Sequence, residues 1–476
     1  MNSKNMNGRE TLGITIKKED SLGDWFSEVI VKAGFADYSP VKGCIYYYPP
    51  AIYAWERIRE FANKLFQEIG IEDVYLPLFI PEEMFEKESE HVHGFSPEVA
   101  WVETDSGRWA VRPTSEVLFS DVFARKVRSY RDLPIKYNQW CSVVRMETKS
   151  VRPFLRGREF LWQETHAVYS CEEDALKDVI YVLNNIYKRI SEELLLIPVL
   201  AGRKSEKEKF AGARKSFGIE GIMPDGKALQ LGTTHYLGQG FARVFDISFL
   251  DEKNQKKYVH QASWGISTRM IGAAIMVHSD NKGIVLNPEL IKNKIVVVPI
   301  VFKESEESKI YAKKIVEKLK LFNPILDDRD YTPGWKFNEW ELKGIPLRLE
   351  IGPRDVEKRQ VIAVLRHNNQ RISIGWDELT EEKINQIFED VKKDLYQNAK
   401  KLFDSYLDSA KDLREFEKKL EMGKIIKVNF CDNPECEEKV KEKYGVTSRV
   451  IVEEKKGKCI FCDHDSNYVA YFGKSY

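Results

Sequence analysis

The 476-residue sequence has no long apolar run. Ile295 to Phe302, one of the longest, contains a proline and is far shorter than the roughly 20 apolar residues that a membrane-spanning helix needs. The opening residues, Met1 to Gly8, include no apolar segment of the kind found in secretory signals. We therefore expect a cytoplasmic protein with no membrane partner.

The chain also has no excess of charge of either sign. Lys plus Arg and Asp plus Glu number 74 each, so any binding of nucleic acid must depend on local patches. The 7 cysteines are an odd number, which does not suit a framework of disulfides. A chain of this length exceeds one hydrophobic core, and we expect about two to four domains.

The most informative stretch of the sequence runs from Gln139 to Tyr169. Two β-rich arms, at residues 137–147 and 160–169, flank a loop. The loop carries a cluster of cationic side chains that suits an anion: Lys149, Arg152, Arg156 and Arg158. A solvated basic hairpin is the simpler alternative.

The order of residues in this stretch resembles motif 2 of the class II aminoacyl-tRNA synthetases. Arg145 and Glu147 form an Arg-x-Glu pair, and the loop is followed by an Arg-x-x-x-Phe-x-x-x-Glu series at Arg156, Phe160 and Glu164. In an ordinary hairpin, charged side chains at these positions would each need a buried partner or contact with solvent. In that family the first arginine binds the α-phosphate of ATP and the phenylalanine stacks on adenine.

A second segment resembles motif 1 of the same family. A helix predicted from Ala51 to Ile69 ends at Gly70, and a strand predicted at Asp73 to Ile80 contains Pro77. Proline is unusual within a sheet, so an ordinary edge strand is the alternative. In the family this motif forms the dimer interface, which implies a homodimer.

Two further segments complete the pattern. Arg112 to Glu116 resembles the substrate loop of the prolyl branch, although Thr114 or Ser115 could instead serve only as a helix cap. Ser263 to Ala273 contains a strand end and a helix start near Thr268, which resembles motif 3. Its arginine, Arg269, would face an anion together with the free amides of the helix, whereas an ordinary arginine at a helix start is solvated.

With these segments in order, the sequence resembles the prolyl-tRNA synthetases of the archaeal and eukaryotic type over nearly its whole length. The resemblance implies activation of L-proline with ATP to prolyl-adenylate, transfer to tRNA(Pro), and Mg²⁺ as a cofactor. It implies that proline contacts Thr114, Glu116, Arg145, Trp162, His166 and His235. It implies that ATP contacts Arg145, Glu147, Arg156, Gly157, Phe160, Gln230, Thr233, Ser267 and Arg269.

Within this set the resemblance makes Arg145 and Arg269 the catalytic residues and Gln230 a candidate Mg²⁺ ligand. One departure is Thr165, where we expect the family to have glycine, and it affects only the local backbone. His166 and His235 have a plain alternative as hydrogen-bonded structural imidazoles. Two other functions stay open: an inactive synthetase-like protein that binds tRNA or an amino acid, and a sister synthetase, for example for threonine, with an active-site metal on Cys141, His166 and His235.

Two local expectations concern the rest of the first half. Ser170 and Glu173 predict a capping box for a helix that continues to about Leu195. Arg203 to Lys215 alternates in charge and predicts a solvated loop, with RNA contact as the alternative.

The expected fold class is α+β with several domains. Residues 1–286 would form the class II catalytic domain with its antiparallel sheet, and residues 287–400 a mixed α/β module that resembles the anticodon-binding domain. Its candidates for reading flipped-out anticodon bases by stacking and edge contacts are Phe337, Glu341, Arg348 and Glu350, for which core packing or surface ion pairs are the alternative.

Residues 401–476 would form a small α/β domain around the last cysteines. Cys431 and Cys436 are separated from Cys459 and Cys462 by a longer segment, and two close thiolate pairs suit tetrahedral Zn²⁺. Four thiolates would close the coordination sphere, which makes a structural zinc the prediction. A metal-free thiol cluster is the alternative, and His464 is a possible substitute ligand.

Overall fold

The computed structural model describes residues 13–89, 98–148, 150–301 and 306–476. The expectations for Met1 to Gly8, for Lys149 and for Phe302 lie outside these residues. Within the described ranges, no helix combines the length and the apolar character that crossing a bilayer would require.

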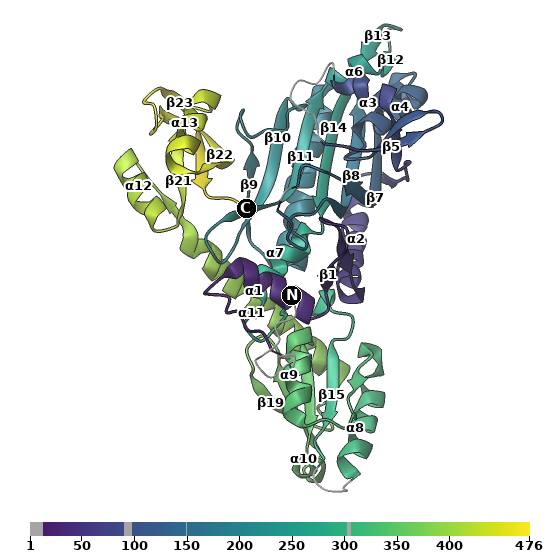
Figure 1. The fold of residues 1–476 in the computed structure, drawn as a ribbon, viewed down its shortest axis with the longest axis vertical. Helices are drawn as coiled ribbons and strands as arrows, with labels where there is room; N and C mark the ends of the chain where they lie inside the picture. The colour runs from purple at the N-terminus through teal and green to yellow at the C-terminus, as the bar shows by residue number, and fades with distance from the viewer. Residues whose placement is uncertain (1–12, 90–97, 149, 302–305) are drawn as a thin grey trace.

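The largest sheet of the molecule has 11 strands and is mostly antiparallel, and its labelled strands lie in the upper part of Figure 1. From one edge, its first seven strands are β3 (Glu72–Asp73), β7 (Ile135–Val144), β8 (Glu159–Tyr169), β14 (His260–Ser267), β11 (Ala228–Gly238), β10 (Lys215–Ile222) and β9 (Val199–Arg203). The sheet continues through β22 (Thr447–Lys458), β23 (Asp465–Gly473), β21 (Ile425–Phe430) and β20 (Leu407–Ser409). The predicted antiparallel catalytic sheet is confirmed.

Alternation along β8 divides its side chains between two environments. Ala167 and Tyr169 pack into the main hydrophobic core, whereas the even-numbered residues between Phe160 and His166 face a cavity. The core side is covered by α1 (Leu22–Lys32), α2 (Pro49–Glu68), α5 (Glu172–Tyr181), two π-helical turns (Val182–Tyr187 and Ile190–Leu194) and α7 (Arg269–His278).

This part of the chain also contains smaller elements. They are β1 (Ala36–Tyr38), β2 (Ile45–Tyr47), β4 (Phe79–Pro81), α3 (Glu82–Ser89), β5 (Ala100–Thr104), β6 (Gly107–Val111), α4 (Glu116–Lys126), α6 (Gly240–Val244), β12 (Ser248–Leu250) and β13 (Lys256–Tyr258). The strand predicted at 73–80 is in part wrong. Pro77 separates β3 from β4, and these two strands belong to different sheets, because proline cannot donate to a continuous ladder.

Residues after Pro288 form a separate five-stranded sheet in the lower part of Figure 1. Its order is β16 (Ile325–Leu326), β15 (Ile295–Pro299), β17 (Leu347–Ile351), β18 (Gln360–Leu365) and β19 (Arg371–Gly375). The first three strands are parallel and the others antiparallel, which confirms a mixed α/β module. Its shorter helices are α8 (Glu307–Lys318), α9 (Pro333–Lys343) and α10 (Pro353–Glu357).

The long helix α11 (Glu381–Tyr406) leads to the C-terminal module, which contains α12 (Leu413–Glu421) and α13 (Pro434–Tyr444). This module joins the central sheet where Ile451 of β22 pairs with Arg203 of β9. The approach is so close that a Cβ at Gly202 would lie 2.4 Å from the carbonyl oxygen of Ile451. A glycine is therefore required at this junction.

One local prediction is wrong and another is wrong in part. The N-cap of α5 is Cys171, which makes no capping hydrogen bond with its side chain, so Ser170 and Glu173 do not form a capping box there. The segment Arg203–Lys215 is mainly a loop with exposed residues, as expected, but Lys204 and Ser205 at its start are only 4% and 1% exposed. Charge alternation misleads here because the C-terminal module covers the start of the segment.

Candidate active site

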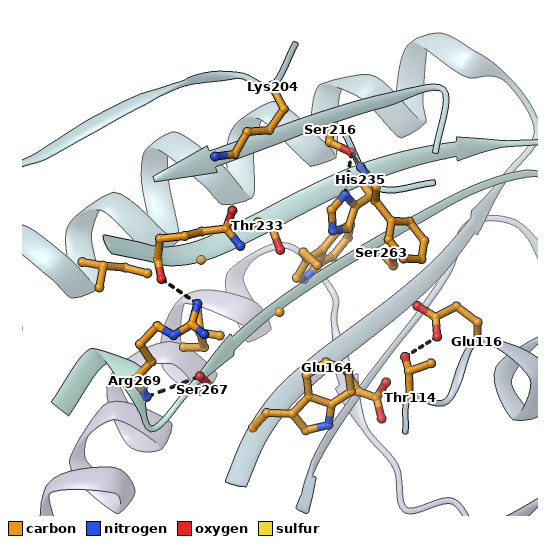
Figure 2. Close-up of a pocket in the computed structure, with 18 of the residues that line it drawn as sticks. Thr114, Glu116, Glu164, Lys204, Ser216, Thr233, His235, Ser263, Ser267 and Arg269 are labelled. Atoms are coloured by element: carbon orange, nitrogen blue, oxygen red, sulfur yellow. Dashed lines mark hydrogen bonds between the residues drawn. The ribbon is translucent and has the colours of Figure 1, made fainter. Parts of the chain in front are cut away.

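A cavity of about 340 Å³ opens on the sheet face opposite the helices. Figure 2 shows side chains from β8, β10, β11 and β14, together with the segment before α4, converging on it. The expected residues that line it are Thr114, Glu116, Arg145, Phe160, Trp162, His166, Gln230, Thr233, His235, Ser267 and Arg269. Segments far apart in the sequence therefore meet at one site.

Arg145 enters the cavity just beyond the end of β7. Its Nε donates to the carbonyl oxygen of Pro113 at 3.1 Å, and its guanidinium lies 5.2 Å from the centre of the Trp162 ring and 5.6 Å from that of Phe160. Burial lowers the pKa of Arg145, while the carboxylates of Glu116, Glu147 and Glu164 oppose the shift. The cation is thus held by an aromatic wall and a backbone oxygen.

Arg269 is the first residue of α7, as the sequence predicts. Its Nη1 donates to the carbonyl oxygen of Gln230 at 3.3 Å, and Nε and Nη2 donate to that of Leu155 at 3.3 and 3.2 Å. Burial, with repulsion from Arg156 and Arg145, lowers the pKa of Arg269 to about 10. The arginines remain charged at neutral pH and repel one another, so a polyanion between them would be stabilised.

The start of α4 supplies a carboxylate, that of Glu116, to the opposite end of the cavity. Thr114 Oγ1 donates a hydrogen bond to Glu116 Oε2. Ser115 does not cap the helix; its Oγ donates to Glu164 Oε1 at 2.6 Å. The capping alternative for Ser115 is wrong, and Glu116 is available to a cationic ligand.

Glu164 is the buried anchor of this end of the site. It accepts hydrogen bonds from Gln139 Nε2 at 2.7 Å and pairs with His166 Nε2 at 3.3 Å. Burial alone would raise the pKa of Glu164, but the bonds from His166, Ser115 and Gln139 outweigh it and hold the pKa below its usual value. Glu164 therefore stays ionised and orients its neighbours.

The two histidines occupy different environments. His166 stacks on Phe119 with ring centres 4.3 Å apart, and His235 Nδ1 shares a hydrogen bond of 2.8 Å with Ser216 Oγ. Burial lowers the pKa of His235 to about 3, so it is neutral at physiological pH. Cys141 accepts from Trp162 Nε1 at 3.3 Å. In the described part of the chain, Cys141, His166 and His235 do not form a potential metal-binding group.

A second hollow continues from the cavity along the motif 2 loop. This hollow shares Arg145, Phe160, Ser267 and Arg269 with the first cavity. It is also lined by the other expected ATP residues, which are Glu147, Arg156 and Gly157. A Cβ at Gly157 would lie 2.9 Å from the carbonyl oxygen of Glu159, which explains the glycine. Both hollows share Arg145 and Arg269, so they form one continuous site.

Several lining residues escape sequence reasoning: Glu164 as an anchor, Lys204, Glu208, Phe210, Ser216, Ser263 and Trp264. Only alternation along β14 signals one of these, since Ser263 lies on the same face as Ser267. Thr165, the departure noted in the sequence, points to the other face and donates to Asn138 Oδ1 at 2.9 Å. Thr165 is therefore not among the residues that line the cavity.

The four anticodon candidates form one cluster in the module after Pro288. Arg348 Nε donates to Glu350 at 2.9 Å, its Nη1 donates to Glu341 at 3.1 Å, and its guanidinium lies 4.2 Å from the centre of the Phe337 ring. Arg371 also donates to Glu350, at 2.6 Å. The structure brings these residues together, but whether they contact RNA stays a prediction.

The four C-terminal cysteines form a compact group. Their sulfur atoms all lie within 4.8 Å of one another, with Cys431 and Cys462 3.7 Å apart and Cys436 and Cys459 4.0 Å apart. Four convergent thiols are the donor set that tetrahedral zinc prefers, so these residues fit the metal. His464 is not part of this group.

Comparisons with known proteins agree with this geometry. Three family descriptions match in order: "tRNA synthetase class II core domain (G, H, P, S and T)" at residues 101–278, "Anticodon binding domain" at 294–386 and "Prolyl-tRNA synthetase, C-terminal" at 413–476. The Proline--tRNA ligase of Ruminiclostridium cellulolyticum is 46% identical over 468 residues, which cover 96% of this chain and 97% of that protein. The chain belongs to the prolyl-tRNA synthetase family.

Other members of the prolyl-tRNA synthetase family are similar over the same span. The Proline--tRNA ligase of Natranaerobius thermophilus is 46% identical, with 97% of this chain and 98% of that protein covered. The Cryptosporidium parvum prolyl-tRNA synthetase complexed with L-proline and AMP has a TM-score of 0.92 and 40% identity, covering 99% of each chain. The same enzyme with halofuginone and AMPPNP gives a TM-score of 0.93. The archaeal and eukaryotic type stays a prediction.

Proposed function

We propose that this protein activates L-proline with ATP to form prolyl-adenylate and transfers the prolyl group to tRNA(Pro). The observation that carries the proposal is the convergence of Arg145 and Arg269 on one cavity whose other end is formed by Thr114 and Glu116. Cations at one end suit the phosphates, and a carboxylate at the other suits the secondary ammonium of proline. An inactive protein that only binds tRNA or an amino acid would not need all of these phosphate-binding arginines, so their presence does not favour that alternative.

In the first step a carboxylate oxygen of proline forms a bond to the α-phosphorus of ATP, and the bond from that phosphorus to the pyrophosphate oxygen breaks. Arg145 offsets the negative charge that gathers at phosphorus, and Arg269 binds the departing pyrophosphate. Thr114 and Glu116 hold the ammonium, while Trp162, His166 and His235 form the pocket for the ring. Because His235 is neutral, it adds no repulsion to that ammonium.

ATP lies across the two connected hollows in this proposal. Phe160 stacks on adenine, and Glu147, Arg156, Gly157, Thr233 and Ser267 surround the nucleotide. Gln230 is the proposed protein ligand of Mg²⁺, since its amide oxygen is the hard type of donor that this ion prefers. Bound Mg²⁺ would neutralise phosphate charge.

In the second step a hydroxyl of the terminal adenosine of tRNA attacks the prolyl carbonyl carbon, and AMP leaves. Incubation with radiolabelled proline, ATP and tRNA(Pro) tests the whole function. Label should enter the RNA only when ATP is present. Absence of charging with a tRNA that another prolyl-tRNA synthetase charges would refute the proposal.

We place the class II catalytic domain at residues 1–286, the anticodon-binding domain at 287–400 and the C-terminal domain at 401–476. The last boundary lies inside α11, a continuous helix that connects two domains. We also propose a homodimer through the motif 1 region. Support comes from large apolar side chains exposed in the segment from Tyr46 to Phe79, with Tyr75 at 75%. A cytoplasmic location is part of the same proposal.

The anticodon proposal predicts an effect confined to the RNA. Arg348→Ala should raise the KM for tRNA by about tenfold, since the contacts of one arginine to a base contribute about 1–3 kcal/mol, and should leave adenylate formation unchanged. Aminoacylation and proline-dependent pyrophosphate exchange measure the two effects. Arg354→Ala, which removes an exposed arginine of the same domain, is the control. A loss of exchange with normal KM for tRNA would argue against the role.

The cysteine group predicts a structural zinc ion. The wild-type protein should contain about one zinc per chain, held by Cys431, Cys436, Cys459 and Cys462. Cys459→Ser should lose most of it and lower the melting temperature, because metal binding stabilises the folded state. Mass spectrometry of metals and thermal unfolding measure these effects, with Cys171→Ser as the control at an exposed cysteine. Full zinc content in Cys459→Ser would contradict the assignment.

A further inference from the structure

Lys204 lies on the cavity wall, just beyond β9, although its sequence context predicts a solvated residue. It lines the cavity and is 4% exposed. Figure 2 shows its side chain extending away from Ser216 and His235. A Cβ at Gly218 would lie 2.9 Å from Lys204 Cε, so the absence of a side chain at Gly218 makes room for the lysine.

Lys204 belongs to a buried group of charges that joins the C-terminal domain to the cavity. Its Nζ donates to Glu220 Oε1 and, at 2.9 Å, to the carbonyl oxygen of Arg449. Arg449 Nη2 also donates to Glu220 Oε1, at 2.9 Å. An ammonium has three N–H donors, so two hydrogen bonds within the protein leave one donor for a ligand in the cavity.

The group holds two cations around Glu220, and some of its polar atoms have no partner. Glu208, which also lines the cavity, lies close enough to Lys204 to raise its pKa against the effect of burial. Glu220 is 0% and Arg449 6% exposed, and two cations share one carboxylate. Among the described residues, Glu220 Oε2 and Arg449 Nε have no hydrogen-bond partner. Buried charges of this kind are costly, and their position at the edge of the site points to a role in ligand binding.

Strand register places Lys204 and Glu220 at the phosphate end of the cavity. In the β10–β11 pair, Glu220 stands opposite Gln230 and Gly218 opposite Thr233. Gln230 in turn accepts the hydrogen bond from Arg269. The carboxylate of Glu220 is also close enough to Arg269 to raise its pKa against the effect of burial.

We propose that Lys204 is a further cation for the phosphate chain of ATP and that Arg449 of the C-terminal domain positions it through Glu220. This inference rests on the proposed function, since it assigns a role in the same ATP site. The C-terminal domain thereby contributes to activation of the amino acid without contributing a residue to the proline pocket.

Further contacts connect the C-terminal domain to the segment that carries Lys204. Arg203, the neighbour of Lys204, donates to Asp432 Oδ2 at 2.7 Å and pairs in register with Ile451. Asp432 Oδ1 also accepts from the amide of Glu206 at 2.9 Å. The segment that carries Lys204 is therefore held at both sides by the C-terminal domain.

The test is a double-mutant cycle in proline-dependent pyrophosphate exchange. Lys204→Met and Arg449→Met should each lower kcat/KM for ATP by about tenfold and leave the KM for proline within about twofold. The double variant should have the same kcat/KM for ATP as Lys204→Met, because Arg449 acts on ATP only through Lys204 in this proposal. Arg449→Lys, which keeps the cation, should recover part of the loss.

Glu438→Gln is the matched control, since it removes an ion pair with Lys207 across the same domain boundary without touching the cavity lining. It should behave as wild type. Unchanged kcat/KM for ATP in Lys204→Met, additive losses in the double variant, or equal changes for proline and ATP would each overturn the inference. Absence of proline-dependent exchange in the wild type would instead refute the proposed function.

Discussion

Arg145→Ala is expected to abolish proline-dependent pyrophosphate exchange. Loss of a preorganised donor at a developing negative charge typically lowers kcat by about 10²–10³-fold, and Arg145 also contributes ground-state binding of the α-phosphate. The measurement is exchange at saturating ATP and proline. The fold should survive, because the guanidinium makes its protein hydrogen bond to a loop carbonyl, that of Pro113, rather than holding two strands together.

The control for this experiment is Arg125→Ala. Arg125 is a surface arginine whose side chain is 76% exposed and whose ion-pair partner among the described residues is Asp121 of its own helix. Its removal should leave exchange and melting temperature unchanged. Undiminished exchange in Arg145→Ala would sink the assignment of the catalytic residue, whatever the other variants show.

Glu116→Gln is expected to have the second-largest effect. The change keeps the size of the side chain but removes the charge that pairs with the secondary ammonium of proline. We expect kcat/KM for proline to fall by about a hundredfold, as is typical when a charged partner is left unpaired in a site without water. The KM for ATP should stay within about twofold of wild type.

Separate titrations of proline and ATP in the exchange assay distinguish this outcome from general damage. Glu103→Gln is a suitable comparison, since the Glu103 side chain is 78% exposed and pairs with Arg108 away from the cavity. If Glu116→Gln weakened ATP and proline equally, Glu116 would be a structural residue and the proline end of the cavity would need another cationic partner.

The parts of the site that depend on short, ordered motifs could be predicted from the sequence. Arg145 and Phe160 are brought together by one hairpin, β7–β8, whose register follows from two arms of alternating residues. Arg269 begins α7 because the strand before it ends at Ser267. These features follow from local sequence patterns. The order of the motifs along the chain predicted that the separate segments would meet at one site.

The parts that depend on tertiary contact could not be predicted. Lys204 lies in a stretch of alternating charge that is typical of a solvated loop, and only the distant Glu220 and Arg449 make its burial possible. Ser115 has the sequence of a helix cap, yet it bonds to Glu164 because β8 passes beside it. In each case a residue remote in sequence competes successfully with the local preference.

Pyrophosphate exchange measured across all amino acids tests the central claim most directly. The account predicts that proline supports exchange with the highest kcat/KM, because a pocket closed by Trp162, His166 and neutral His235 and headed by Glu116 fits a small secondary ammonium. Arg145→Ala should remove that signal. Exchange supported by another amino acid in preference to proline, or by none, would contradict the account.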